Sequence, residues 1–172
     1  MGQREWILYE NGKYRFNRSL NYWYDVDAFE NRIKAAQTML ERAPVQAIEE
    51  LEAAVSMYRG DFLANISSDE WGALRREELQ QAFMGAMKSL GKLLIENGFH
   101  GRAVEVYKLL LDEDNLLEEA HRGLMRAHLF NGERGLALRQ YKTLVEVLRD
   151  ELGISPSTKT TSLYQELKKT SS

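Results

Sequence analysis

The chain has 172 residues, 44% of them hydrophobic, and a formal net charge of −3 at pH 7. This hydrophobic fraction excludes an intrinsically disordered chain. Acidic and basic residues are interleaved along the sequence, which gives no overall electrostatic reason to bind nucleic acid or an anionic membrane. The lack of cysteine excludes disulfides and thiolate sites and fits a cytoplasmic protein. No run of about 18 apolar residues is available to span a bilayer.

Two short β-prone runs come first, at 6–9 and 14–16, with Asn11 and Gly12 between them. An Asn-Gly pair tolerates the positive φ angles of a tight hairpin turn, so this segment is predicted to form a two-stranded ribbon. An isolated hairpin is only marginally stable in water. The aromatic run 22–24 is therefore expected to pack against it rather than stack on bases, since no basic groove accompanies these rings.

The rest of the chain has apolar residues at helical spacing. Asp27 is expected to cap a first helix over 28–41, and Pro44 suits the first turn of a second helix that ends near Gly60. A long helix is predicted over 70–96. Further helices are expected at roughly 100–112, 117–130, 134–151 and 158–168.

The sequence contains an internal repeat of 34 residues. The phrase "ENGFHGRAVEVYKLLLDED" begins at Glu96, and "FNGERGLALRQYKTLVEVL" begins at Phe130. Random matching in such a window gives roughly one or two identities, and shared amphipathicity does not explain glycines at equal offsets. Nine pairs are identical: Ala86/Ala120, Leu90/Leu124, Asn97/Asn131, Gly98/Gly132, Gly101/Gly135, Ala103/Ala137, Tyr107/Tyr141, Lys108/Lys142 and Leu110/Leu144.

The period and the order of residues resemble the tetratricopeptide repeat, with its Leu-Gly-x-x-Tyr and Ala-x-x-x-Phe patterns. Gly91 and Ala103 are expected to let two antiparallel helices approach closely, while Tyr107 fills the gap to the next pair. The second copy has Met125 where the first has Gly91, so it should pack slightly differently.

A weaker earlier pair of helices is expected at 29–41 and 46–58, and the last helix is expected to cap the array. The predicted fold is therefore all-α: a right-handed tetratricopeptide-like stack of about three helical pairs plus a C-terminal capping helix, with a short N-terminal β-hairpin. Three pairs with a cap is the minimum for a stable stack.

Four longer stretches resemble the bacterial transcriptional activator domain, which follows the DNA-binding module in the Streptomyces antibiotic regulatory protein family of transcriptional regulators. The resemblance covers about residues 24 to 168. Its marks, in order, are an Asp-Val-Asp-x-Phe start, a Tyr-Arg-Gly-Asp-Phe-Leu loop, an Arg-Arg-Glu helix start and a Glu-Leu-Gly-x-x-Pro-Ser end. The stretches are "YWYDVDAFENRIKAA" (22–36), "AIEELEAAVSMYRGDFL" (47–63), "RREELQQAFMGAMKSLGKLL" (75–94) and "ELGISPSTKTTSLYQEL" (151–167).

The segment "ILYENGKYRF" (7–16) is similar to the closing hairpin of a winged helix-turn-helix. The resemblance thus implies two parts: residues 1–24, a hairpin remnant of a preceding winged-helix domain with its linker, and residues 25–172, the activator domain. The abrupt start indicates a piece of a longer protein. Because the recognition helix is missing, this chain is not expected to bind DNA directly. The implied function is protein interaction and oligomerisation in a bacterial transcriptional regulator. The implied partners are other domains of the parent, RNA polymerase, or a second copy in a homodimer.

Two other interpretations remain open: a tetratricopeptide scaffold unrelated to transcription, and a small helical enzyme or ligand sensor. Catalysis lacks a nucleophile with a base, a phosphate loop and a defined acid pair, so no enzyme and no cofactor are expected. His121 and His128 offer two imidazoles roughly 10 Å apart along a helix, whereas a metal needs three or four ligands. They are interpreted as packing or surface residues, the 112–114 acidic run as a solvated turn, and the 59–61 tripeptide as a helix end.

The candidate partner site follows from the repeat. In tetratricopeptide arrays the first helix of each pair lines the concave face. Spacings of three or four residues put the side chains of each helix on one stripe, and positive charge recurs at positions 34 apart. This strip is interpreted either as a surface for an acidic partner segment or as a solvated helix face. The expected residues are Lys88, Lys92 and Glu96 in one helix, and Glu119, Arg122 and Arg126 in the next.

Overall fold

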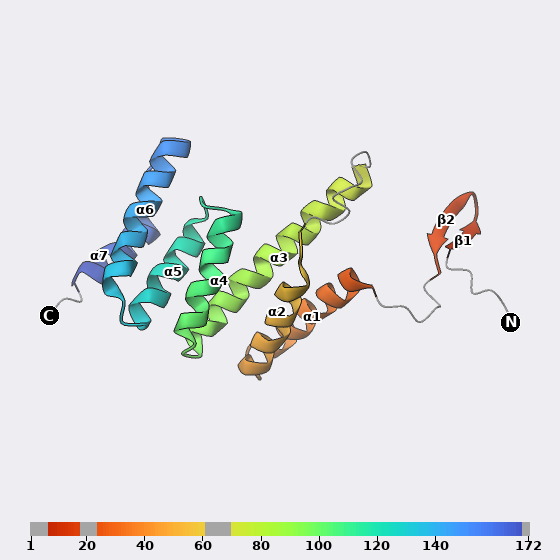
Figure 1. Ribbon diagram of the computed structural model, residues 1–172, viewed down its shortest axis with the longest axis horizontal. Coiled ribbons are helices and arrows are strands. Elements are labelled where there is room, and N and C mark those ends of the chain that lie inside the picture. Colours follow the sequence, from red (N-terminus) through yellow and green to blue (C-terminus); the bar gives the residue numbers. More distant parts are fainter. Residues whose placement is uncertain (1–6, 18–23, 61–69, 170–172) are drawn as a thin grey trace.

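The computed structural model describes residues 7–17, 24–60 and 70–169, which contain two strands and seven helices. The helices follow one another side by side along the long axis of Figure 1, each turning back on the one before. Within these three ranges, no helix combines the length and the apolar character needed to cross a bilayer. The helices are α1 (Asp25–Met39), α2 (Pro44–Met57), α3 (Glu70–Glu96), α4 (His100–Glu113), α5 (Glu118–Phe130), α6 (Arg134–Leu152) and α7 (Thr158–Lys169).

The two strands, β1 (Ile7–Glu10) and β2 (Lys13–Phe16), pair in antiparallel register. Asn11 and Gly12 connect them, and both have positive φ, at 53° and 76°. Positive φ at both central residues is what the tight two-residue hairpin turn requires, because its backbone then follows the right-handed twist of the strands. The predicted packing of this hairpin on the aromatic run 22–24 falls mostly outside the described residues.

The start of α1 differs from its prediction. Asp27 does not cap the helix, which begins two residues earlier, at Asp25, after Tyr24 in an extended conformation. The side chain of Asp25 accepts a hydrogen bond from the amide of Val26 at 2.9 Å. Val26 and Phe29 are both buried, so burying this i, i+3 apolar pair extends the helix toward the N-terminus. In α2, Pro44 occupies the first turn as predicted, and the helix ends at Met57, three residues before Gly60.

Two identical turns end helices α3 and α5. Gly98 and Gly132, the repeated glycines, have φ of 80° and 78°, a left-handed conformation that glycine adopts without steric cost. In each turn the amide of the following residue reaches back to the helix, from Phe99 to the Leu94 carbonyl and from Glu133 to the His128 carbonyl, both at 2.8 Å. The same turn geometry therefore sets the same reversal of direction in both repeats.

The core runs continuously from α1 to α5 and then gives way to a smaller cluster. Small residues, among them the fully buried Ala103, lie where neighbouring helices cross. The smaller cluster joins α5, α6 and α7, and in it Tyr141 stacks on Tyr164 with ring centroids 4.0 Å apart and planes 8° apart. Met125, at the position of Gly91 in the first copy, is part of this cluster. The second repeat therefore packs differently, as the change from glycine to methionine predicts.

Tyr107 occupies a slot between α3 and α5 that two glycines create. It belongs to α4, and its ring lies between Gly91 of α3 and Gly123 of α5. A Cβ atom on Gly91 would lie 2.7 Å from the ring, and one on Gly123 would lie 2.2 Å from it. Both distances are shorter than van der Waals contact allows, so neither position accepts alanine without displacing the tyrosine.

The slot predicts an unusual cost for a small substitution. Gly123→Ala should lower the free energy of unfolding by about 1–3 kcal/mol, because the new methyl group overpacks the Tyr107 ring. Gly101→Ala is the matched control: it also lies in a helix, but a Cβ there meets nothing within 4 Å, so it should be neutral or slightly stabilising. Urea denaturation followed by circular dichroism measures both. Equal stability of the two variants would contradict the slot.

Candidate partner-binding groove

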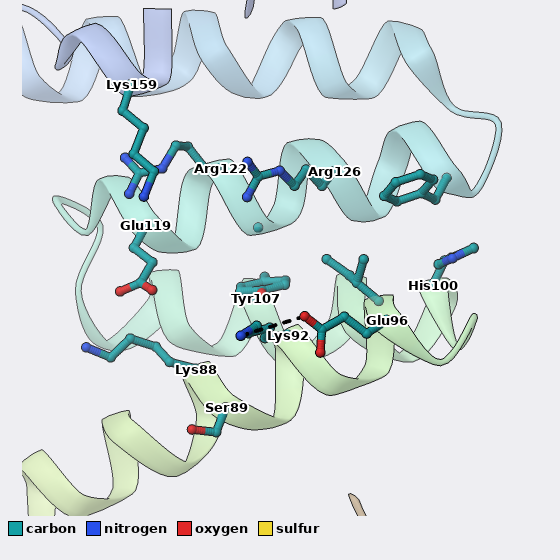
Figure 2. A pocket seen from close by; sticks show the side chains of 13 residues that line it. Lys88, Ser89, Lys92, Glu96, His100, Tyr107, Glu119, Arg122, Arg126 and Lys159 are labelled. Atoms are coloured by element: carbon teal, nitrogen blue, oxygen red, sulfur yellow. Dashed lines mark ion pairs between the residues drawn. The ribbon is translucent and has the colours of Figure 1, made fainter. Parts of the chain in front are cut away.

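A groove of about 650 Å³ lies between α3, α5 and α7. These three helices form its walls, and the Tyr107 ring lies at its centre between α3 and α5 (Figure 2). We call it the inner groove. Its lining residues are Lys88, Ser89, Lys92, Ile95, Glu96, His100, Tyr107, Glu119, Arg122, Gly123, Arg126, Phe130 and Lys159.

The structure brings all six residues of the predicted strip together in this groove. Three come from α3 and three from α5, on facing sides of it (Figure 2). It adds Lys159, which reaches in from α7 and which the repeat pattern could not indicate, because α7 is not part of the repeat. The six predicted residues are Lys88, Lys92 and Glu96, with Glu119, Arg122 and Arg126.

Positive charge predominates in the inner groove. Its lining contains five lysine or arginine side chains and two glutamates, which leaves a surplus of three positive charges, whereas the whole chain has a net charge of −3. Lys92 approaches Glu96 at 3.7 Å on the same helix, yet its side chain is 74% exposed. Such an exposed pair contributes little to stability, so the Lys92 ammonium is available to a bound anion.

Arg122 differs from the other cations in the groove. Its side chain is only 12% exposed and forms an ion pair with Glu118 at 3.7 Å. Its guanidinium also donates a hydrogen bond to the hydroxyl of Thr160 at 2.8 Å. Arg122 is therefore mainly a structural contact between α5 and α7, rather than a freely solvated member of the strip.

Glu118 anchors the N-terminus of α7. Its carboxylate accepts hydrogen bonds from the Ser157 amide at 3.1 Å, from the Ser157 hydroxyl at 2.7 Å and from the Thr160 hydroxyl. Burial alone would raise the pKa of Glu118, but these hydrogen bonds outweigh it and lower the pKa below its ordinary value. A carboxylate at a helix N-terminus is also stabilised by the helix dipole. Glu118 is thus one of the groups that hold the third wall of the groove in place, together with Arg122.

Tyr107 contributes a polar group to the floor of the groove. The residue is 5% exposed, and burial, with the nearby charge of Glu119 as a smaller cause, raises the pKa of its hydroxyl to about 12. The hydroxyl is therefore neutral and able to donate at physiological pH. One end of the groove is less polar, because the ring of Phe130, 55% exposed, stacks on His100 with centroids 5.2 Å apart.

The two other histidines take part in packing contacts within the fold. In His121, Nε2 lies 2.9 Å from the Asn115 carbonyl oxygen and Nδ1 lies 2.7 Å from the Gln140 amide. His128 contacts Glu133 at 2.7 Å. Among the residues that the structure describes, no three histidine, cysteine or acidic side chains gather as a metal site would require.

The remaining sequence candidates lie in turns. In the acidic run 112–114, the side chain of Asp114 accepts a hydrogen bond from the Leu116 amide at 2.9 Å and so closes the turn between α4 and α5. Of the tripeptide 59–61, Arg59 and Gly60 follow the end of α2 and are exposed, and the third residue is outside the described ranges.

Substituting Glu118 should loosen the third wall. Glu118→Gln removes the charged acceptor of the α7 contacts, and hydrogen bonds to a charged group contribute about 1.5–3 kcal/mol each before solvent exposure is considered. We expect a net loss of about 1–2 kcal/mol in unfolding free energy. Relative to the wild type, the amide exchange rate should increase more in α7 than in α3. Glu146→Gln, on the exposed side of α6, is the control. Unchanged exchange in α7 would contradict the anchoring role.

Stability should also depend on pH through His121. Burial is the main cause that lowers the pKa of His121 below its ordinary value of 6.5, so below pH 6.5 the unfolded chain takes up a proton that the folded chain does not. Stability is therefore full above that pH and falls as the pH decreases toward the lower folded pKa. The free energy of unfolding, measured by urea denaturation at pH 7.5 and at pH 5.5, should differ less between the two pH values for His121→Gln than for the wild type. His100→Gln, at the groove rim, should keep the wild-type difference.

Comparisons with known proteins agree with this architecture. The model of the family described as "Bacterial transcriptional activator domain" matches residues 24–168. No curated protein matches the sequence. Mycobacterium tuberculosis EmbR, solved in complex with a low-affinity phosphopeptide, is similar with a TM-score of 0.80 at 19% identity, over 95% of this chain and 43% of that chain. The C-terminal TPR-containing domain of a Plasmodium falciparum FK506-binding protein is similar with a TM-score of 0.59 at 11% identity, over 86% of this chain and 92% of that chain.

At these identities the two structures establish the shared helical fold, and the chain spans less than half the length of EmbR. The family model covers nearly all the described helices, including every element that lines the inner groove. It also corresponds to the span in which the four sequence stretches resemble the activator domain. The chain therefore belongs to the bacterial transcriptional activator domain family.

Proposed function

We propose that this chain is the protein-interaction and oligomerisation domain of a bacterial transcriptional regulator and that its partner binds in the inner groove. The observation that carries the proposal is the local surplus of positive charge within an acidic chain. Charge of one sign on the walls of a groove attracts segments of the opposite sign and speeds their association. The groove contains no catalytic constellation that would favour an enzyme over a binding module.

The proposal includes a specific organisation of the chain. Residues 1–24 are the closing hairpin of a preceding winged-helix domain with its linker, and 25–172 are the activator domain. The pairs α1/α2, α3/α4 and α5/α6 act as three repeats in a right-handed array that α7 caps. In this arrangement DNA binding belongs to the preceding domain, and the present chain transmits the signal to protein partners in the cytoplasm.

Three partners fit an acidic segment: another domain of the same regulator, RNA polymerase, or a second copy of the chain. The alternative of a peptide-binding scaffold unrelated to transcription draws support from the similarity to a TPR-containing domain, but the family match favours a regulator. The negative net charge of the chain, and the two glutamates among the groove cations, argue against direct nucleic-acid binding.

Reversing the groove charge tests the proposal. Lys92→Glu combined with Arg126→Glu, in the full-length regulator, should lower transcriptional activation at least about tenfold while helicity stays unchanged, since both side chains are exposed. Rim charges act mainly on association rate and salt dependence. Arg139→Glu with Lys142→Glu makes the same change of charge on exposed positions of α6, outside the groove, and should leave activation intact.

Activation is measured with a promoter reporter, and protein level by immunoblot. Activation at the wild-type level in both double variants would reject the groove as the partner site. Loss of activation in both, at normal protein level, would mean that overall charge matters rather than the groove.

A further inference from the structure

The ring of Tyr107 extends from α4 into the space between α3 and α5. The ring atoms nearest to Gly91 and Gly123 include Cζ, the carbon that bears the hydroxyl. The slot is therefore narrowest at the far end of the side chain, and the hydroxyl lies beyond it, at the lining of the inner groove (Figure 2). Because these two positions are glycine, the Tyr107 side chain passes between α3 and α5 and brings its hydroxyl to the inner groove.

No hydrogen bond to the Tyr107 hydroxyl is found among residues 7–17, 24–60 and 70–169, although the residue is 5% exposed. Fully buried side-chain polar atoms in this part of the chain all have partners, so the hydroxyl meets the open space of the groove. Tyr141, the equivalent residue 34 positions later, differs: its hydroxyl lies 3.4 Å from the hydroxyl of Thr161, within the fold. Of these two repeated tyrosines, Tyr107 has a donor directed at a ligand site.

The charges around the hydroxyl decide which acceptor suits it. Glu119 and Glu96 act on it electrostatically, and Arg126 opposes them. A carboxylate or phosphate placed directly on the hydroxyl would meet two glutamates against one arginine, whereas a neutral carbonyl carries no charge for the glutamates to repel. The cations that exceed these glutamates in number line the same groove, so acidic side chains of a ligand find partners to either side of the hydroxyl.

We infer that the inner groove binds an extended acidic protein segment whose main-chain carbonyl accepts a hydrogen bond from the Tyr107 hydroxyl. This inference rests on the proposed function and deepens it, because it names the chemistry of the partner and the residue that donates a hydrogen bond to its main chain. Lys88, Lys92 and Arg126 pair with aspartate or glutamate side chains of the segment. A nucleic acid fits less well, because its phosphates would meet the two glutamates beside the hydroxyl.

The less polar end of the groove adds a preference for composition. The exposed ring of Phe130 stacks on His100, and both residues line the groove together with Ile95. A large apolar or aromatic side chain of the segment packs on this surface, because burying apolar area away from water is favourable. The segment therefore combines acidic residues with a neighbouring aromatic residue, a composition that a purely polyanionic ligand lacks.

The test removes one oxygen atom. Tyr107→Phe keeps the ring in its slot and the melting temperature of the 172-residue chain unchanged, since the hydroxyl bonds to nothing in the described fold. The probe is a fluorescein-labelled peptide of alternating aspartate and glutamate with one central phenylalanine, measured by anisotropy at 50 and 200 mM salt. Tyr107→Phe should weaken binding about fivefold, as expected for one neutral hydrogen bond, by the same factor at both salt concentrations.

Two variants make the result specific. Lys92→Glu with Arg126→Glu should weaken binding at 50 mM salt far more than at 200 mM salt, because its effect is electrostatic. Tyr141→Phe removes a hydroxyl at the equivalent repeat position outside the groove and should bind the probe like the wild type. A change of less than twofold for Tyr107→Phe, with the charge reversal still effective, would overturn the role of the hydroxyl and leave the proposed function standing.

Other outcomes reject the inference more broadly. Absence of probe binding up to millimolar concentration, or equal binding of a peptide with glutamine and asparagine in place of the acids, would overturn the acidic segment. Equal competition by a single-stranded oligonucleotide would make the groove a general polyanion site. Dimerisation seen by analytical ultracentrifugation, and abolished by the charge reversal, would assign the groove to a second copy instead. Normal transcription by the reversed full-length regulator would reject the proposed function itself.

Discussion

The insertion of Tyr107 between Gly91 and Gly123 is the contact on which the inner groove depends. The aromatic ring comes from α4 and fills the space between α3 and α5. The glycine on each of these two helices lacks the Cβ atom that would exclude the ring. The ring therefore sets the separation of α3 and α5. Because those helices form two walls of the groove, packing in the core determines the width of a surface site. Interiors packed to native density transmit such constraints rather than absorb them.

A second constraint acts at the C-terminal end, where α7 completes the groove. The stack cannot end on an inner-facing apolar surface, so the last helix covers it with Leu163 and Leu167. Its angle of approach is set by polar contacts, in which Glu118 and Arg122 of α5 bind the hydroxyls at the start of α7. A cation in a groove can thus serve the fold first: Arg122 stabilises the wall, while Lys92 and Arg126 remain exposed to a ligand.

The sequence predicted the helices well because local signals mark their ends. The 34-residue repeat placed the turns at Gly98 and Gly132, and its phase placed the six residues of the strip in one groove, three on α3 and three on α5. The predicted start of α1 was wrong, because the burial of Val26 outweighs the capping preference of Asp27. Gly123 was missed because it pairs with Ser89 in the repeat, although a glycine inside a helix costs about 1 kcal/mol and so signals a close approach. The contact of Arg122 with Thr160 joins residues 38 positions apart, and Lys159 lines the groove from the same helix α7, across an interface that no periodicity describes.

The differences between the two repeats carry as much information as their identities. Where the first copy has Gly91, the second has Met125, and the tyrosine that enters a glycine slot in the first copy stacks on Tyr164 in the second. The same residue thus reaches a groove in one repeat and closes the array in the other. Repetition supplies identical helical units, but a binding site needs one place where the units are not identical. In this chain that place is the gap between α3 and α5, because there the packing that holds the helices apart also directs a hydroxyl toward whatever lies in the groove.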